Sequence, residues 1–442
     1  MAAQQDLLSI ERRTIAKVSW RLLPLVALGY CIAYVDRSNI SIAALTMNKD
    51  LGFSAYIYGW AAGIFFFGYF LFEIPSNLVL ERVGARIWIA RIMITWGIIS
   101  GLTAFVTGTT SFLIVRFLLG AAEAGFFPGM ILYLTYWFPS QYRGRVISTL
   151  FVAQPVANAV ASIASATILE MDGVLGLKGW QWIFIIEAIP ALLLAVVVFK
   201  AMTDRPALAN WLTMDERKWL QTSIDEENRK VESTGRLTLF KALADPRVLA
   251  LSAIYLMSVT ANYGIVFFMP QIIKGIGLSN MMTGVVSSIP YVVGTIGLLA
   301  WGWSSDRSKE RRWHLIVASV VGALGFAFAA ATGASYWALI GMSAATVGIY
   351  GSRAAFWPMP SIFLTGTAAA GAIALINATG NLGGYFGPFI VGWIKDYTGS
   401  FQAGLYFLAG CSLTCAVITF FAARAAGDPV AMARASAASP AE

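Results

Sequence analysis

Twelve long apolar stretches run along the chain, separated by short polar segments. Each has roughly the 20 apolar residues that a helix needs to cross the hydrocarbon core of a bilayer. Inside lipid a backbone has to satisfy its own hydrogen bonds, so we expect an all-α membrane protein with twelve transmembrane helices. The predicted spans are residues 18–45, 56–80, 87–107, 111–138, 146–168, 180–200, 248–272, 282–303, 313–332, 335–359, 367–394 and 401–423.

Charged residues are scarce and unevenly placed. They make up 12% of the 442 residues, about half the share in a soluble globular domain. Residues 201–247 hold 16 of the 54 charged side chains, eight of each sign. We expect this segment to be a cytoplasmic linker with a helix near 214–228. It would join an N-terminal six-helix bundle (1–200) to a C-terminal one (248–424), and the Ala/Ser-rich residues 425–442 are predicted to be a disordered tail.

The positions of Lys and Arg predict the orientation of the chain. Cytoplasmic loops of membrane proteins are enriched in these residues. With the N-terminus inside, the linker and most basic loops face the cytoplasm, and the opposite side receives only Lys49, Lys178, Lys274 and Lys395. Both termini are therefore predicted to be cytoplasmic. The net charge of +8 is explained by this orientation, so we expect the lipid bilayer and no nucleic acid as a partner.

An internal repeat divides the chain into two halves. Glu81–Arg82 follows the second span, and Asp306–Arg307 follows the eighth, 225 residues later. Two parallel halves of six helices are typical of secondary transporters, in which the binding site is expected at the interface of the repeats. The three cysteines lie in apolar stretches and there is one histidine, so neither a disulfide framework nor a metal site is predicted.

The loop motif resembles that of the major facilitator superfamily. Its match is good at residues 302–312, whereas at 77–86 Asn77 stands for a Gly and Glu81 for an Asp. Other segments are similar to the anion:cation symporter family, which includes bacterial permeases for tartrate, galactonate and phthalate: 34–39, 72–77, 136–139, 204–206 and 377–384. The resemblance implies a multi-pass protein of the bacterial inner (plasma) membrane.

Ionisable side chains lie within two of the predicted N-terminal spans: Asp36 and Arg37 in the first, Arg116 and Glu123 in the fourth. Such a residue costs roughly 2.5–3.5 kcal/mol at a helix centre, so it indicates a function. Arg116 and Glu123 are seven residues apart and share a helix face. Consecutive helical residues point about 100° apart, so Glu123 is expected to pair with Arg37, and Asp36 to meet Arg116.

These four residues predict coupling between a proton and an anion. If Asp36 or Glu123 takes up a proton, its arginine is released to bind a carboxylate, for which the planar guanidinium is well shaped. We therefore expect Asp36 and Glu123 to couple protons and Arg37 and Arg116 to bind substrate, and the resemblance implies the same roles. The alternative is a purely structural ion-pair cluster joining two helices.

Further polar residues are candidates for the substrate cavity. The resemblance implies that Tyr34, Tyr69, Gln154, Trp357 and Asn377 line it; the alternative for each is an ordinary interhelical hydrogen bond. Arg353, in the tenth span, departs from the family pattern. We hypothesise that it binds a second carboxylate of the substrate, and the alternative is that it reaches the membrane interface.

Several charged residues are interpreted as structural or conformational. The acid–Arg pairs Glu81/Arg82 and Asp306/Arg307 are expected to clamp helix ends in one conformation and to open during turnover. Glu73 and Glu187 lie nearer to span ends, and we interpret them as packing or gating elements.

The sequence thus predicts a secondary active transporter, a proton-coupled symporter that imports an organic anion such as a sugar acid or dicarboxylate by alternating access. The alternative is an uncoupled exporter or exchanger. Tartrate-like acids, aldonates and aromatic diacids all fit, sodium remains open as the coupling ion, and a monomer is expected. An enzyme is not predicted, since no intramembrane histidine or nucleophile–base pair occurs. No cofactor is expected, because no phosphate-binding Gly-x4-Gly-Lys-Ser/Thr loop is present.

Overall fold

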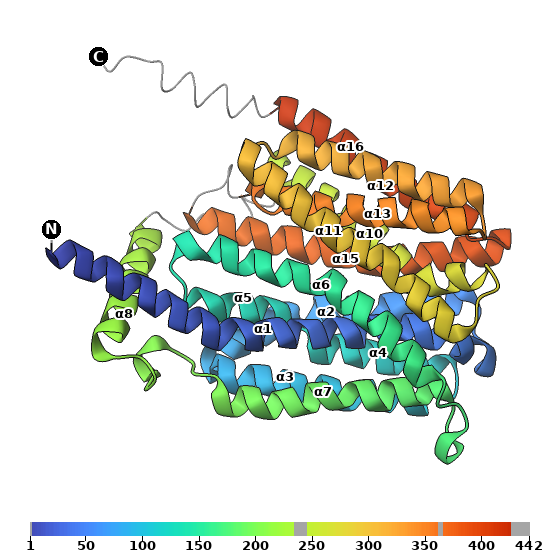
Figure 1. Cartoon of the computed structure of the whole chain (residues 1–442), viewed down its shortest axis with the longest axis horizontal. Helices are drawn as coiled ribbons and strands as arrows, with labels where there is room; N and C mark the ends of the chain where they lie inside the picture. Colours follow the sequence, from blue (N-terminus) through green and yellow to red (C-terminus); the bar gives the residue numbers. More distant parts are fainter. Residues whose placement is uncertain (1, 234–244, 361–365, 426–442) are drawn as a thin grey trace. The chain divides into compact units, whose positions relative to one another are not determined.

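The computed structural model describes residues 2–233, 245–360 and 366–425, and these residues are helical almost throughout (Figure 1). None of them lies in a β-strand. Helices close all their backbone hydrogen bonds within one segment, which is what a chain this apolar requires. The all-α fold class predicted from the apolar stretches is confirmed.

The helices follow one another with short connections, and three of these contain a turn of 3-10 helix. In chain order they are α1 (Ala2–Asp50), α2 (Ala55–Val83), α3 (Ala85–Leu102), η1 (Thr103–Phe105), α4 (Thr109–Glu123), α5 (Phe126–Thr135), α6 (Ser140–Leu169), η2 (Val174–Gly176), α7 (Gly179–Ala201), η3 (Pro206–Leu208), α8 (Met214–Ser233), α10 (Pro246–Lys274), α11 (Asn280–Ser308), α12 (Arg312–Thr332), α13 (Tyr336–Phe356), α15 (Gly366–Thr398) and α16 (Gln402–Ala425).

Ten stretches of the described chain are long and apolar enough to cross a membrane. They correspond to the first nine predicted spans and to the twelfth. The tenth and eleventh predicted spans coincide with the helices α13 and α15. The protein is therefore a multi-pass membrane protein, while the count of twelve and the cytoplasmic termini stay predictions. The predicted disordered tail, 425–442, lies almost wholly outside the described residues.

The chain forms two compact units. Unit 1 comprises residues 1–235 and 266–292, and unit 2 comprises residues 236–265 and 293–442. Unit 1 contains the predicted N-terminal bundle, and in it α2 packs on α4, α3 on α7, and α1 on both α6 and α7. In unit 2, α12 packs on α13 and α16. The bundle limits of 1–200 and 248–424 stay a prediction.

The fourth predicted span, 111–138, is not one helix. It breaks after Glu123 into α4 and α5, and the break lies at Gly125, which has φ 84°. This left-handed conformation is accessible to glycine because it lacks a Cβ. A Cβ here would also collide with the side chain of Ser76 on α2. The predicted span itself is present, since Thr109–Thr135 is long and apolar enough to cross a membrane, and the break makes Glu123 the last residue of α4.

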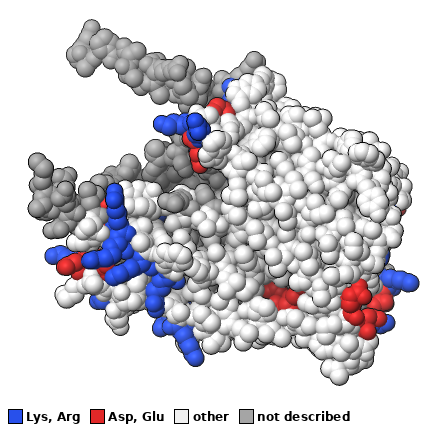
Figure 2. All heavy atoms as spheres, viewed as in Figure 1, with Lys and Arg blue, Asp and Glu red and all other residues white. Residues whose placement is uncertain are grey.

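The predicted linker helix is present as α8 and is attached to unit 1. Its Glu216 is fully buried and accepts hydrogen bonds from Arg13 and Lys17 on α1, both at 2.8 Å. Near its other end Glu227 pairs with Arg143 on α6 at 3.0 Å. In Figure 2, Lys and Arg side chains gather at this end of unit 1, where α8 and the start of α1 lie.

Candidate functional site

The centre of unit 1 holds an ion pair between α1 and α4. Arg37 donates from Nη2 to Oε1 of Glu123. The Arg37 side chain is 11% exposed and that of Glu123 is 2% exposed, so the pair is removed from solvent. The predicted pairing of these two residues is present.

Aromatic rings surround the guanidinium of Arg37. Its Cζ lies 5.1 Å from the ring centre of Tyr34, 5.1 Å from that of Phe65 and 5.4 Å from that of Tyr69. A cation over ring faces at this range is stabilised electrostatically. Tyr34 and Tyr69, both predicted for the cavity, are therefore brought to the same arginine.

Arg116 also contacts Phe65, with its Cζ 5.1 Å from the centre of that ring. It is completely buried, and its Nε donates to the backbone oxygen of Ala61 at 3.4 Å. Its two terminal nitrogens, Nη1 and Nη2, have no hydrogen-bond partner among the described residues. A buried guanidinium with unused donors is energetically costly, and an anion is the natural group to satisfy them.

A close helix crossing holds Arg116 in this place. One turn further along α4, Gly120 touches the backbone of α2, and a Cβ there would collide with the backbone oxygen of Phe65. Small residues let helices in membranes approach this closely. The contact explains why the Arg116 side chain reaches a carbonyl group of α2.

Asp36 is buried. The sequence predicts that it meets Arg116, but the structure shows no ion pair between these two residues. Both oxygens of Asp36 accept hydrogen bonds from α3 instead: Oδ2 from Trp96 Nε1 at 2.7 Å and Oδ1 from Ser100 Oγ at 3.1 Å. The reason is rotational. Asp36 follows the helix away from Arg37 toward α3, whereas Arg116 and Glu123 lie on α4. Neutral donors therefore satisfy Asp36 in this conformation.

Gln154 lies on α6 and is buried, with Asn158 one turn further along the same helix. The sulfur of Cys31 on α1 lies 3.7 Å from the backbone oxygen of Ala153, so this part of α6 packs against the half of α1 that carries the charges. The two amide side chains are thus buried polar groups of the same bundle.

The predicted residues of unit 2 gather around the end of α13. Arg353 is 7% exposed, with its Cζ 5.7 Å from the ring centre of Tyr350. Its burial argues against the alternative in which the side chain reaches the interface. Trp357 packs against Tyr255 at 5.1 Å between ring centres. Both rings pack against a buried apolar cluster that includes Ile376 on α15, and Asn377 is the next residue of that helix.

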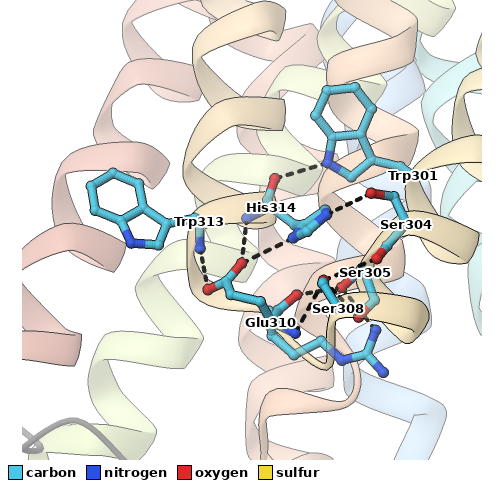
Figure 3. Close-up of polar contacts among 8 residues, drawn as sticks. Trp301, Ser304, Ser305, Ser308, Glu310, Trp313 and His314 are labelled. Carbon is cyan, nitrogen blue, oxygen red and sulfur yellow. Dashed lines mark hydrogen bonds and ion pairs between the residues drawn. The ribbon is translucent and has the colours of Figure 1, made fainter. Parts of the chain in front are cut away.

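The loop between α11 and α12 carries a dense hydrogen-bond network (Figure 3). Glu310 caps α12 by accepting from the backbone N–H groups of Trp313 at 2.7 Å and His314 at 3.1 Å. The His314 ring bridges Glu310 and Ser304, at 2.9 and 3.0 Å. The sequence predicts a pair of Asp306 with Arg307. In the structure Asp306 pairs with Arg311 at 2.5 Å, and the Arg307 side chain lies over the ring of Trp303.

The corresponding loop in unit 1 is anchored differently. Glu81 and Arg82 are exposed, and Asp204, beyond α7, contacts this loop. Its carboxylate accepts from the backbone N–H of Arg86 at 2.8 Å, at the start of α3, where a helix N-terminus favours a negative charge. Asp204 was noted only as part of a family motif, and its role in anchoring this loop was missed.

The hydrogen-bond donors to the buried acids Asp36 and Glu187 could not be predicted from residue spacing. Trp96 and Ser100 are four residues apart on α3, which places them on one helix face, but an apolar span gives no signal of which acid they bind. Glu187 on α7 was interpreted as packing or gating; it is buried and accepts from Ser165 Oγ at 2.6 Å.

Comparisons with known proteins show the family of the chain and its fold. Residues 26–369 match the Major Facilitator Superfamily. The chain is 50% identical over 421 residues to a protein of Agrobacterium vitis named "Putative tartrate transporter", covering 95% of this chain and 94% of that one. It is 40% identical over 414 residues to a quinolone resistance transporter of Acinetobacter baumannii, covering 93% and 95%.

Among solved structures, the fold resembles a bacterial homolog of the human lysosomal transporter Spinster, with a TM-score of 0.74 at 16% identity, covering 91% of this chain and 96% of that one. The relatives and the matching folds are transporters and not enzymes. Together with the family match across most of its length, this shows that the chain belongs to the major facilitator superfamily of membrane transporters.

Proposed function

We propose that the protein is a secondary active transporter of the bacterial inner membrane that imports an organic anion together with protons by alternating access. The observation that carries the proposal is the pair of buried arginines that both lie 5.1 Å from the ring centre of Phe65. Arg37 is neutralised by Glu123, whereas the terminal nitrogens of Arg116 have no partner among the described residues. An anionic substrate would supply the missing charge.

The proposed coupling step is an exchange of partners. A proton that binds Glu123 neutralises the carboxylate and breaks its ion pair with Arg37. The freed guanidinium then offers two parallel N–H donors to a substrate carboxylate. When substrate and proton leave, the pair with Glu123 forms again, so that the empty carrier is internally neutral at this point. Asp36 provides the second proton-binding carboxyl.

The proposed substrate class is a small dicarboxylate or sugar acid. A relative at 50% identity is named for tartrate, and tartrate carries two carboxylates and two hydroxyl groups. Arg116 and Arg37 fit one carboxylate. Arg353, buried in unit 2 beside Tyr350, is the proposed ligand of a second carboxylate, and Trp357 and Asn377 are proposed to contact the rest of the substrate.

The test is uptake by the purified protein in proteoliposomes. Tartrate, an aldonate, an aromatic diacid and a monocarboxylate would be compared, each with an inside-alkaline pH gradient, with a sodium gradient and with neither. The proposal expects concentrative uptake of a dicarboxylate or sugar acid that depends on the pH gradient. Uptake that ignores the pH gradient, or no uptake of any carboxylate, would contradict it.

An uncoupled exporter or exchanger is the second candidate. The relative named for quinolone resistance, at 40% identity, favours it. Such a carrier keeps the arginines but needs no titrating acid. It predicts that substrate exchange across the membrane continues unchanged when Asp36 and Glu123 are replaced by their amides.

A further inference from the structure

A third buried acid lies in unit 1, outside the arginine sites. Glu187 is in the middle of α7 and is 5% exposed. Its Oε1 accepts a hydrogen bond from Ser165 Oγ on α6 at 2.6 Å. Its Oε2 is buried and has no hydrogen-bond partner among the described residues. No ion pair of the described chain includes it, and the side chains that reach it are the neutral Ser165 hydroxyl and the neutral amide of Asn39 on α1, so Glu187 has neutral donors and no cation.

Asp36 provides the matched comparison in the same bundle. Each of its two oxygens accepts a hydrogen bond, one from Trp96 and one from Ser100. Two donors on two oxygens suit an ionised carboxylate, which accepts hydrogen bonds and donates none. In Glu187, by contrast, the buried Oε2 accepts no hydrogen bond, which suits a carboxylic acid whose proton is on that oxygen.

The two acids also influence each other. Among the charged groups of the helices packed on α7, Asp36 on α1 is the one that acts electrostatically on Glu187, and Asn39, three residues further along α1, lies beside Glu187. Two carboxylates that share a poorly solvated site resist being ionised together. With Asp36 ionised, Glu187 is the group that keeps the proton.

The position of Glu187 along the bundle indicates the direction in which this proton would move. Ser165 lies four residues, about 6 Å, before the end of α6 at Leu169. Asp36 lies 14 residues, about 21 Å, before the end of α1 at Asp50. These helix ends meet at the end of unit 1 opposite to α8 (Figure 1). Glu187 therefore lies between that end of the bundle and Asp36.

We infer that Glu187 is a further proton-binding residue of the transport cycle, which holds a proton in this conformation and passes it to Asp36. In that step the O–H bond of Glu187 breaks and an O–H bond forms on Asp36, so the pair keeps a single negative charge. The protonation of Asp36 then competes with its hydrogen bonds from Trp96 and Ser100. The role in transport rests on the proposed proton-coupled function, whereas the presence of the proton does not.

The first test is infrared spectroscopy of the purified, reconstituted protein at neutral pH. A protonated carboxyl has a carbonyl stretch that an ionised carboxylate lacks. Glu187→Gln is expected to remove intensity from this band, and Glu123→Gln, which removes an ion-paired acid, is expected to leave it unchanged. An unchanged band in Glu187→Gln, with a folded protein by size-exclusion chromatography, would overturn the inference.

The second test separates transport from proton storage. The ratio of protons to tartrate taken up is measured in wild type and in Glu187→Gln, alongside tartrate counterflow, which needs no net proton movement. The ratio and the gradient-driven uptake are expected to fall relative to counterflow. Loss of the infrared band with an unchanged ratio would mean a structural proton and would overturn the role in transport. A wild type without gradient-driven uptake would contradict the proposed function instead, and the infrared result would still decide whether Glu187 holds the proton.

Discussion

Arg37 on α1 and Glu123 on α4 form a buried ion pair at the point where the fourth span is broken. The break makes Glu123 the last residue of α4, two residues before Gly125. An ion pair in such a place has to open if the arginine is to serve a substrate.

Removing one partner of this pair is expected to destabilise the protein more than removing both. A buried charge left alone costs about 3–5 kcal/mol, whereas replacing the whole pair is often close to neutral. Arg37→Gln or Glu123→Gln should therefore lower the thermal unfolding temperature more than the double variant. The more exposed pair of Arg143 with Glu227, whose side chains are 26% and 20% exposed, is the control; replacing both by Gln should have smaller effects because solvent screens this pair more. Equal losses for single and double variants would show that the pair is not coupled.

Arg116→Lys is expected to weaken tartrate binding by roughly 10–100-fold, since hydrogen bonds to charged groups are worth about 1.5–3 kcal/mol. Lysine keeps the charge but lacks the fork that two carboxylate oxygens require. Isothermal titration on the detergent-solubilised protein measures the effect. Arg12→Lys, an exposed residue of α1, is the matched control. Wild-type affinity in Arg116→Lys would remove this residue from the site.

Arg353→Gln is expected to distinguish substrates by their number of carboxylates. If Arg353 binds the second carboxylate, uptake of a dicarboxylate falls by roughly tenfold or more while a monocarboxylate is little affected. Competition by both acids against labelled tartrate in proteoliposomes provides the measurement, with the exposed Arg12→Gln as control. An equal loss for both classes would mean that Arg353 only supports the fold of unit 2.

The attachment of α8 to α1 is expected to depend on acid pH through Glu216. Burial alone would raise the pKa of Glu216, but hydrogen bonds from Lys17, the Thr213 backbone and Arg13 outweigh it and lower the pKa to about 2. An unfolded glutamate has a pKa of about 4.3. The stabilisation is therefore complete above about pH 4.3 and is lost as the pH falls toward about 2.

Limited proteolysis of the chain between α7 and α8 measures the detachment of α8 from α1. Cleavage should increase in wild type as the pH falls through that window, while Glu216→Gln should already be cleaved at neutral pH. The exposed Glu226→Gln on the same helix should behave as wild type. A Glu216→Gln protein that resists cleavage at neutral pH would show that the contact does not hold α8.

Helical periodicity and the cost of buried charge were enough to predict the membrane class, the linker helix and the pair of Arg37 with Glu123. These arguments did not predict features that depend on contacts between residues far apart in the sequence. The turn at Gly125 depends on Ser76, 49 residues away, and the partners of Asp36 come from an apolar helix whose rotation no local pattern encodes. Asp306 pairs with Arg311 and not with its neighbour Arg307, because the loop folds back to cap α12. The position of Glu187 along its span did not show that Ser165 and Asp36 lie near it.

The central claim is that buried acids of α1 and α4 couple protons to an anion held by Arg37 and Arg116. Its most direct measurement compares pH-gradient-driven tartrate uptake with tartrate counterflow in proteoliposomes of wild type, Asp36→Asn and Glu123→Gln. The account predicts that wild type concentrates tartrate only with the gradient, and that both variants lose this response while some counterflow remains. Variants that still concentrate tartrate in response to the gradient would contradict it.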